Sequence, residues 1–412
     1  MTLDMGFVES QFPELHTRDY IYMDNAGGSL VLGGVAEKVS EYLLTMSVQH
    51  GASYSKSQLA MDRLESASQS AAKFINATRP EEIIMGSSTT ALLRMLSSAF
   101  GRILQPGDEI VVSQGEHESN YGAWELLEEK GIKIINWPLE KQSLRLEKRT
   151  LESLMTSRTK LVCFNHVSNI LGTINPVREL TECAHAGGAK VCVDGVAYAP
   201  HRLIDVAALG VDYYVFSFYK VYGPHHAMLY GRYDDLLNLP GCNHAFIEED
   251  DIPYKFQPGN VSYELSYSTS AIKDYIIALA HRDKPEMTGD REFLKHGFDL
   301  IAAHEETLSK RLLEYLQTIP GVRIFGELQP DAALRVPTIS FTLGNQDSKK
   351  IVEQIDPFNI GIRFGDFYAQ RLVNELGLAR QNGVVRVSMA HYNTLKEIDT
   401  LIEHLDPILN QS

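Results

Sequence analysis

The sequence predicts an α/β protein, with a mostly parallel sheet in a large domain and a smaller α+β domain after it. Between about residues 82 and 230, short apolar runs alternate with longer helical patterns, which is typical of a sheet whose strands are joined by helices. The runs are continuously apolar, as strands buried on both faces are. After about residue 285 the composition changes to charged helical stretches mixed with isolated strands. These three observations favour two lobes of unequal size.

Six apolar runs are the expected strands of the large sheet, and helical patterns fit between them. One helix is expected over residues 90–100, where apolar side chains fall on one helical face. Another is expected over 179–185, because Gly187 and Gly188 follow it and glycine commonly ends a helix. The expected strands are residues 83–85, 110–113, 132–137, 160–164, 190–193 and 213–216.

The C-terminal part is expected to form the small α+β domain. Thr394 and Glu397 have the spacing of a capping box, and apolar residues repeat after them with a helical period, so a final helix is expected there. The other expected helices are 305–316 and 349–354, and the expected strands are 322–325, 338–341 and 384–388. The sequence thus divides into an N-terminal segment (1–20), a large domain (21–285) and a small C-terminal domain (286–412).

Composition excludes several classes of function. The 412 residues include 38 basic and 53 acidic side chains, and the net charge of −15 without a dense Lys/Arg run argues against nucleic-acid binding. The longest uncharged stretch near the middle, residues 161–177, is too polar to span a membrane, and the first residues do not resemble a secretory signal. The four cysteines show no CxxC spacing, so a reducing, cytoplasmic setting is expected.

Polar side chains follow the ends of the expected strands. In an open α/β sheet, ligands bind beyond the carboxyl ends of the strands, so these side chains are candidates for a shared site. A hydroxyl-rich turn at the start of a helix also attracts anions through its free backbone N–H groups. The candidates are residues 86–90, Glu116, His117, His166, Asn169, Asp194 and residues 217–220.

Taken singly, each candidate has an ordinary structural interpretation. The hydroxyls of residues 87–90 also suit a simple helix cap, and Asp194 also suits a cap of the following turn. His117 and Glu118 begin the zinc pattern HExxH, but Tyr121 stands where its second histidine would be, which disfavours a metal site. Lys220 is less easily explained, because a buried amine at the end of an aromatic strand needs a partner or a covalent role.

Taken together, the candidates match the requirements of a pyridoxal phosphate enzyme. Such an enzyme needs a lysine for covalent attachment, a carboxylate for the pyridine nitrogen, a flat side chain over the ring and a cup for the phosphate. Lys220, Asp194 and His117 supply the first three parts. Hydroxyl side chains supply the cup: Ser88, Thr89 and Ser217.

At these residues the sequence resembles the class V aminotransferase superfamily of fold-type I pyridoxal phosphate enzymes, in its cysteine desulfurase-like branch. The resemblance extends over nearly the whole chain and therefore implies the fold-type I architecture as well as the cofactor. The matching stretches are Tyr22-Met-Asp-Asn-Ala26, Glu116-His117 with Asn120, residues 166–176, Val193-Asp194-Gly195 with Pro200-His201, residues 217–220 with Tyr222-Gly-Pro224, Arg386-Val-Ser, and Tyr392-Asn-Thr394.

The resemblance implies a role for each cofactor-binding residue. Lys220 is implied to bind the cofactor covalently and to move the Cα proton, Asp194 to keep the pyridine nitrogen protonated, and His117 to stack on the ring. Asn169 is implied to hydrogen-bond the ring hydroxyl oxygen. The phosphate is implied to be held by Ser88, Thr89, Ser217 and Tyr219, although Tyr219 equally suits an aromatic that only packs.

The resemblance also implies a homodimer with shared active sites. Asn260 aligns with a residue that such enzymes donate to the phosphate of the neighbouring subunit. Arg386 matches the arginine that binds the substrate α-carboxylate, and Arg363 and Tyr368 fall in a loop near the substrate. The expected partner is a small amino-acid substrate, with no nucleic acid and no membrane.

Two residues depart from the pattern of this branch. Cysteine desulfurases carry a loop cysteine that accepts the substrate sulfur, and Tyr368 stands in its place, with no cysteine after Cys242. A phenol cannot become a persulfide, so strict desulfurase chemistry is in doubt. Ala197 replaces a Gln or His that normally donates to a ring oxygen of the cofactor, and Tyr198 is one alternative donor.

The leading hypothesis is therefore a carbon-sulfur β-lyase that acts on cysteine or an S-substituted cysteine. It accounts for a complete set of cofactor residues without the sulfur nucleophile. The alternatives are another pyridoxal phosphate reaction of an amino acid (transamination, epimerisation or retro-aldol cleavage) and a desulfurase that uses an external thiol acceptor. A non-enzymatic alternative is an inactive cofactor-binding relic.

Overall fold

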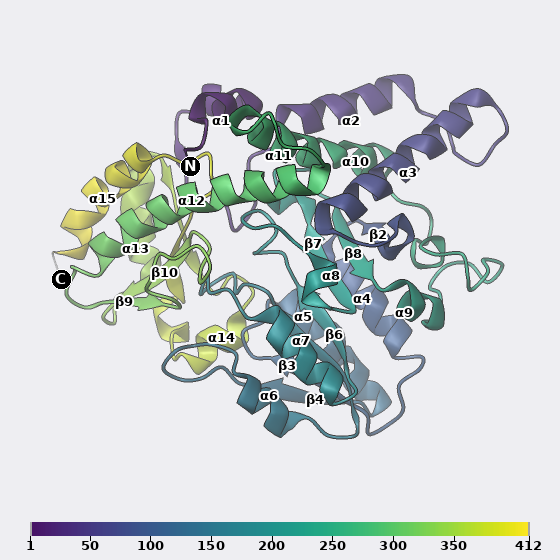
Figure 1. Ribbon diagram of the computed structural model, residues 1–412. Coiled ribbons are helices and arrows are strands. Elements are labelled where there is room, and N and C mark those ends of the chain that lie inside the picture. Colours follow the sequence, from purple (N-terminus) through teal and green to yellow (C-terminus); the bar gives the residue numbers. More distant parts are fainter. Residues whose placement is uncertain (1, 411–412) are drawn as a thin grey trace.

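A seven-stranded sheet forms the centre of the larger lobe in the computed structural model, which describes residues 2–410 (Figure 1). Its strand order is β2-β8-β7-β6-β5-β3-β4, and all strands except β8 run in the same direction. The prediction of a mostly parallel sheet is confirmed. The strands are β2 (Ile83–Gly86), β3 (Glu109–Ser113), β4 (Lys133–Trp137), β5 (Thr159–Asn165), β6 (Lys190–Asp194), β7 (Tyr213–Ser217) and β8 (Ala227–Gly231).

Strand β8 is the one strand of this sheet that was not predicted from the apolar runs of the sequence. It pairs antiparallel with both β7 and β2. The connection from Ser217 to Ala227 is too short for the crossover that a parallel neighbour requires, so the chain must turn back. That turn contains Lys220.

Helices cover both faces of the sheet because its strands are apolar on both sides. Along β3, Ile110 and Val112 face α4 (Thr89–Phe100) and α5 (Glu118–Glu125), whereas Val111 faces the opposite layer. The opposite layer includes α7 (Val177–Ala186) and α11 (Ser270–Asp283). The other helices of this lobe are α1 (Met5–Gln11), α2 (Gly33–Thr45), α3 (Ser55–Ile75), α6 (Lys148–Leu154), α8 (Val206–Leu209), α9 (Tyr233–Asn238) and α10 (Tyr263–Ser268).

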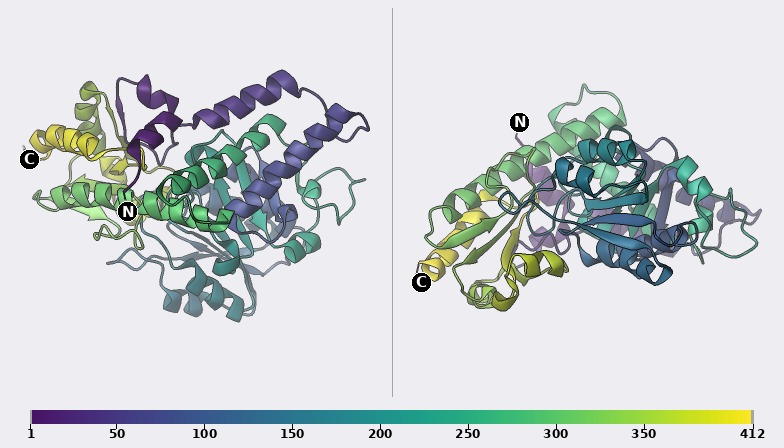
Figure 2. Two further views of the ribbon diagram at one scale, coloured as in Figure 1. Left: turned by 45° about the horizontal axis from the view of Figure 1, so that its top comes forward. Right: turned by 90° about the horizontal axis from the view of Figure 1, so that it is seen from below.

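The C-terminal part contains a second sheet, which lies beside the larger one (Figure 2). It is antiparallel, with the order β12-β13-β10-β9. The capping box of the last helix is confirmed, since Thr394 and Glu397 bond reciprocally at its start. The elements are α12 (Asp290–Leu316), β9 (Val322–Phe325), β10 (Thr338–Leu343), α13 (Ser348–Ile355), β11 (Ile360–Gly361), β12 (Arg363–Gly365), α14 (Gln370–Glu375), β13 (Val384–Ser388) and α15 (Leu395–Leu409).

Helix α12 connects the two lobes. Its first half buries Leu294 and Phe298 in the core of the larger lobe, and its second half buries Leu308 and Leu312 in the core of the smaller one. No helix in residues 2–410 has an apolar stretch long enough to cross a membrane. Short 3-10 helices lie at Pro13–His16, Pro80–Glu82, Leu126–Lys130, Phe218–Lys220, Tyr254–Phe256, Asp356–Phe358 and Ala379–Gln381. The domain boundaries at 20/21 and 285/286 remain predictions.

After α1, which packs on the large lobe, the N-terminal chain passes along the small lobe and then returns to the large one. Strand β1 (Ile21–Tyr22) pairs with β11, and Asp24 forms a bridge with Ser388 at the end of β13. The next residues then reach the larger lobe, where the Ala26 carbonyl lies beside Lys220. This path brings Asp24 to the junction of the two lobes.

Candidate active site

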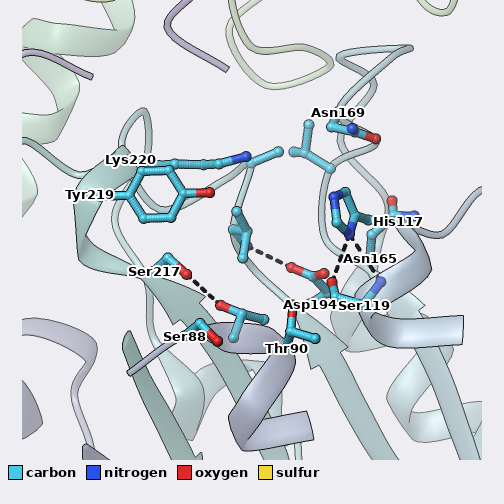
Figure 3. A pocket seen from close by; sticks show the side chains of 14 residues that line it. Ser88, Thr90, His117, Ser119, Asn165, Asn169, Asp194, Ser217, Tyr219 and Lys220 are labelled. Carbon is cyan, nitrogen blue, oxygen red and sulfur yellow. Dashed lines mark hydrogen bonds between the residues drawn. The ribbon is translucent and has the colours of Figure 1, made fainter. Parts of the chain in front are cut away.

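A pocket opens at the carboxyl ends of β5, β6 and β7, next to the starts of α4 and α5 (Figure 3). This is the position expected for a ligand of a parallel sheet. Eight of the predicted site residues line it: Ser88, Thr89, His117, Asn169, Asp194, Ser217, Tyr219 and Lys220. The other lining residues are Thr90, Ser119, Asn165, Val167, Val196 and Ala197.

Lys220 ends the 3-10 turn that follows β7, and its amine points into the pocket (Figure 3). Its Nζ donates to the Ala26 carbonyl at 2.7 Å, and no carboxylate of residues 2–410 forms an ion pair with it. Burial lowers the pKa of Lys220 to about 8, with a smaller contribution from the charge of Arg386. The amine is therefore much easier to deprotonate than an exposed lysine.

Asp194 is the last residue of β6 and is buried. Its Oδ1 accepts a hydrogen bond from the backbone N–H of Val196 at 2.9 Å. Burial raises the pKa of Asp194 to about 6, so the carboxylate is still ionised at neutral pH. Gly195 is required after it, because a Cβ there would lie 2.1 Å from the ring of Tyr214.

His117 is the N-cap residue of α5. Its Nδ1 accepts the backbone N–H of Ser119 at 3.0 Å and lies 2.8 Å from the Ser119 hydroxyl. A backbone N–H can only donate, so Nδ1 carries no proton and the neutral ring holds its proton on Nε2. Burial, followed by the charges of Lys220 and Arg386, lowers the pKa of His117 to about 4. His117 is therefore a flat, neutral ring.

Hydroxyl groups gather on the opposite side of the pocket, where Ser88, Ser217 and Tyr219 lie together (Figure 3). The Ser88 hydroxyl accepts the backbone N–H of Ala91 at 3.1 Å, so it caps α4, as one of the two sequence interpretations had it. Thr89 and Ser217 share a hydrogen bond of 2.7 Å. The hydroxyls and the start of α4 together form an anion-binding surface.

Arg386 lies in β13 at the lobe junction, outside the pocket wall. Its side chain is 2% exposed, and its Nη2 donates to Asp24 Oδ1 at 2.8 Å. Its Nη1 donates to the Asn169 carbonyl at 3.2 Å, whereas its buried Nε has no hydrogen-bond partner. Arg363 lies directly opposite on β12, and its Nη1 is 3.5 Å from Asp24 Oδ2. Asp24 therefore lies between two arginines.

The loop after β12 covers one side of the pocket. The carbonyl of Tyr368 accepts the backbone N–H of Glu118 at 2.7 Å, and the carbonyl of Phe367 accepts the amide of Asn169 at 2.8 Å. Tyr368 is 69% exposed, and its ring centroid lies 5.3 Å from that of His117. Phe367 and Tyr368 both have positive φ, at 51° and 61°. Hydrogen bonds from the large lobe therefore hold an uncommon loop conformation.

Two other predicted residues lie away from the pocket. Asn260 is exposed and lies beside His50, with its Oδ1 3.4 Å from the imidazole Nε2. Tyr198 does not provide the donor that Ala197 lacks. Its ring stacks on His166 at 3.5 Å, and its hydroxyl donates to the Leu203 carbonyl at 3.3 Å.

Two residues at the site were not selected from the sequence. Asp24 fell only inside a quoted motif, and Ser119 follows His117 at the start of α5. A helix start predicted at this position would have pointed to Ser119, because early helix residues offer backbone donors to a capping side chain.

Glu116, one of the candidates at the strand ends, forms the buried support behind His117. Its side chain accepts hydrogen bonds from the amides of Asn120 and Asn165, both at 2.6 Å. Burial, together with the charge of Asp194, raises the pKa of Glu116 to about 7. It thus joins β5 to the loop that carries His117.

The pocket residues fit pyridoxal phosphate. The fit rests on a buried amine without a carboxylate partner, a buried carboxylate on a neighbouring strand, a neutral flat ring, and a helix start surrounded by hydroxyls. Each of these groups suits a different part of the cofactor: aldehyde carbon, ring nitrogen, ring face and phosphate.

Comparisons with known proteins agree with this fit. The aminotransferase class-V family matches residues 21–254 and 291–401. An aminotransferase-like protein of Gibberella zeae is 41% identical over 410 residues, with 98% of each chain covered. A cysteine desulfurase of Serratia proteamaculans is 31% identical over 427 residues, with 99% of each covered.

Solved structures agree as well. The crystal structure of the cysteine desulfurase CsdA from Escherichia coli superposes on the chain with a TM-score of 0.84 and 26% identity, covering 100% of both chains. Fold, pocket and sequence thus lead to one conclusion. The chain belongs to the class V aminotransferase family, in its cysteine desulfurase-like branch, and is a fold-type I enzyme that depends on pyridoxal phosphate.

Proposed function

We propose that the chain is a carbon-sulfur β-lyase that releases the sulfur group from cysteine or an S-substituted cysteine. The observation that carries the proposal is a pocket lined by eight of the predicted site residues and by no cysteine. Cys163 and Cys192 lie opposite each other inside the central sheet, Cys183 is buried in α7, and the Sγ of Cys242 contacts the Met95 carbonyl. None of the four lines the pocket. An elimination needs no protein thiol, whereas a persulfide carrier does.

Lys220 and Asp194 carry the central proton chemistry in this proposal. Pyridoxal phosphate, when bound, withdraws electrons from the substrate Cα and so weakens the bonds to it. Asp194 holds the proton on the ring nitrogen, which its ionised carboxylate favours. Lys220 takes the proton from Cα, a task suited to an amine whose pKa is about 8. His117 covers the ring face.

The remaining cofactor contacts come from the hydroxyl side of the pocket and from the neighbouring strand. Ser88, Thr89, Ser217 and Tyr219 hold the phosphate, together with the free N–H groups of α4. The amide of Asn169 hydrogen-bonds the ring oxygen. Asn260 lies outside the pocket of its own chain, which is consistent with its donation to the phosphate of a second copy in a homodimer.

Arg386 orients the substrate by its α-carboxylate. A guanidinium binds a carboxylate through two parallel N–H groups, and Arg386 has a buried Nε without a partner in residues 2–410. Asp24 already binds Nη2 of Arg386. The substrate carboxylate therefore either shares the guanidinium with Asp24 or displaces the Asp24 side chain from it. Arg363 lies on the exposed side of the ion pair between Arg386 and Asp24. Tyr368 faces His117, on the side where the β-substituent of the substrate would lie.

The proposed reaction breaks one bond at Cα and one at Cβ. Lys220 accepts the Cα proton, and the Cβ–S bond breaks with both electrons leaving on sulfur. The sulfur takes up a proton and departs as a thiol or as hydrogen sulfide. Water then hydrolyses the three-carbon remainder to pyruvate and ammonia, so no oxidant or reductant is consumed.

The test is to supply the holoenzyme separately with L-cysteine, L-cystine and S-alkyl-L-cysteines. The expected products are pyruvate, ammonia and the sulfur compound in equal amounts, with an unchanged mass of the intact protein. Absence of pyruvate from every sulfur amino acid would contradict the proposal. Sulfur that appears on an added thiol, with alanine as the coproduct, would instead identify a desulfurase. The Lys220→Ala variant is the control for chemistry at the pocket.

A second candidate is amino-group transfer. It is favoured by the relative from Gibberella zeae, which is 41% identical and is described as aminotransferase-like. The same pocket residues would serve, because removal of the Cα proton begins both reactions. A panel of amino acids with added pyruvate or 2-oxoglutarate distinguishes the two. Transamination forms a 2-oxo acid with its side chain intact, whereas the lyase releases the side-chain sulfur.

A further inference from the structure

The guanidinium of Arg386 is almost completely covered by the chain itself. Its side chain is 2% exposed, and its Nε is buried without a hydrogen-bond partner in residues 2–410. A guanidinium binds a carboxylate most tightly through two parallel N–H groups. A substrate carboxylate therefore cannot reach two N–H groups of Arg386 unless a covering group moves away.

Three groups of the chain lie against this guanidinium. Asp24 Oδ1 accepts from Nη2 at 2.8 Å, the Asn169 carbonyl accepts from Nη1 at 3.2 Å, and the centre of the Phe367 ring lies 3.6 Å from the guanidinium carbon. Asn169 and Phe367 hold each other, since the Asn169 amide donates to the Phe367 carbonyl at 2.8 Å. Asp24 is thus the covering group whose side chain can move by itself.

Arg363 offers the Asp24 side chain a second cation. It lies directly opposite Arg386 on the neighbouring strand, and its Nη1 is 3.5 Å from Asp24 Oδ2. The backbone of Asp24 is fixed, because its carbonyl accepts the N–H of Gly27 at 2.9 Å and the residue bridges to Ser388. Gly27 leaves room beside the carboxylate, since a Cβ there would lie 3.0 Å from Oδ2. The carboxylate can therefore turn towards Arg363 while its backbone stays in place.

The charges of these groups favour an exchange of partners. Like charges directly opposite each other on neighbouring strands are unfavourable, and Asp24 offsets this repulsion between the two arginines. A bound substrate carboxylate gives the cluster two cations and two anions. Two carboxylates on one buried guanidinium repel each other, so each carboxylate is best paired with its own arginine. Arg386 adjoins the pocket wall at Asn169, whereas Arg363 is 57% exposed, so Arg386 suits the substrate and Arg363 suits Asp24.

We propose that Asp24 is a positioning residue that covers Arg386 until the α-carboxylate of the substrate displaces it, and that Arg363 then holds the displaced Asp24 carboxylate. Arg363 acts on substrate binding through Asp24 and does not touch the substrate. The inference rests on the role of Arg386 given under the proposed function. It is independent of the reaction that follows, because each candidate reaction starts from an amino acid with an α-carboxylate.

The test measures how much the substrate carboxylate contributes to binding. L-Alanine and L-alaninamide, which lacks the carboxylate, are titrated into the holoenzyme, and the absorbance of the bound cofactor gives the two dissociation constants. L-Alanine has no leaving group at Cβ, so elimination does not interfere. The carboxylate preference is the dissociation constant of L-alaninamide divided by that of L-alanine.

Two single variants are expected to change this preference in opposite directions. Asp24→Asn is expected to raise it about tenfold, because a neutral amide competes less well for the guanidinium than a carboxylate does. Arg363→Gln is expected to lower it about tenfold, because Asp24 then lacks a second cation and stays on Arg386. Arg363→Lys is expected to restore it, since an ammonium group also holds a carboxylate. An unchanged or lower preference in Asp24→Asn overturns the inference.

The double variant Asp24→Asn/Arg363→Gln shows whether Arg363 acts through Asp24. Its carboxylate preference is expected to match that of Asp24→Asn alone, because the effect of Arg363 requires the Asp24 carboxylate. A fall relative to Asp24→Asn that is as large as the fall caused by Arg363→Gln alone would show that Arg363 contacts the substrate. That result overturns the inference as well.

The matched control is Asp399→Asn, which removes the carboxylate of an exposed ion pair with Arg311 in the small lobe. It is expected to leave the preference unchanged. Arg386→Gln tests the proposed function separately and is expected to abolish the preference. An unchanged preference in Arg386→Gln overturns the placement of the substrate carboxylate, and this inference with it. Failure to form pyruvate while all preferences behave as expected contradicts only the lyase.

Discussion

The guanidinium carbon of Arg386 lies 3.6 Å from the centre of the Phe367 ring. This stacking joins the loop after β12 to the arginine that is proposed to bind the substrate carboxylate. Arg386 is also held by its ion pair with Asp24, in which Nη2 lies 2.8 Å from Oδ1. The arginine is thus held by an aromatic face and a carboxylate, with Nε left for a ligand.

Replacing Phe367 by leucine keeps apolar bulk and removes the aromatic face. A desolvated cation–π contact contributes about 2 kcal/mol, so KM is expected to rise up to about thirtyfold while kcat changes less. Steady-state kinetics with the best substrate of the panel will show this. Phe358→Leu, at an exposed site in the small lobe, is the control. A fall in kcat with unchanged KM would instead place Phe367 in the chemical step.

Lys220→Ala is expected to abolish covalent attachment of the cofactor and all turnover. The purified wild-type protein is expected to absorb between roughly 400 and 430 nm, as cofactor bound to lysine does, and the variant is not. Persistence of that absorbance in the variant would show that another amine holds the cofactor. If the wild-type protein shows no such band even after addition of pyridoxal phosphate, the result would favour the hypothesis that the chain is an inactive relic.

Covalent attachment of the cofactor is expected to speed up as pH rises to about 8 and then to level off. The reacting form of Lys220 is the neutral amine, and burial lowers the pKa from 10.5 to about 8. Below this pH the neutral fraction falls about tenfold for each unit. Stopped-flow absorbance of the cofactor-free chain mixed with pyridoxal phosphate measures the rate. A rate that still rises at pH 10 would contradict the lowered pKa.

His117 is expected to stay neutral, with its proton on Nε2, down to about pH 5. Its pKa is lowered from 6.5 to about 4. Between these pH values His117 is therefore neutral in the folded protein but protonated in the unfolded chain. This residue therefore costs stability as pH falls from about 6.5 towards 4. The Ser119→Ala variant removes a donor to Nδ1 and is expected to raise the pKa of His117. NMR of labelled histidine follows both the tautomer and the titration.

Tyr368→Cys is expected to give the chain a sulfur acceptor. The position is exposed and lies beside His117, so a thiolate there can reach a substrate sulfur. Mass spectrometry after incubation with cysteine should show at most one added sulfur atom per chain. Tyr368→Phe is the matched control and should show none. A persulfide on the wild-type chain would contradict the proposed function itself.

The large sheet could be predicted because each of its parallel strands is a continuous apolar run. Strand β8 could not, since its direction depends on the short turn at Lys220. The cofactor residues could be predicted as a group because they follow successive strands of one sheet. The contacts of Arg386 could not, because Asp24 and Phe367 come from segments whose meeting depends on how the two lobes pack.

For two other residues, the role could not be predicted from the residue type because it depends on a neighbouring group. Ser88 has a hydroxyl that suits both a helix cap and an anion, and only the bond to Ala91 shows the cap. Tyr198 looked like a substitute donor beside Ala197, but its ring is occupied by stacking on His166. In both cases the residue type permits the role, and the neighbour decides it. Asn260 lies outside its own pocket, so its role across a dimer remains a prediction.

Residues 21–24 contact the small lobe, although they lie near the start of the chain. Asp24 enters the ribosome exit tunnel early, whereas Arg386 is among the last residues to be synthesised. Lys220 and the cofactor cup come from the middle of the chain and are available sooner. The cofactor pocket and the proposed carboxylate site therefore depend on parts of the chain that are synthesised at different times.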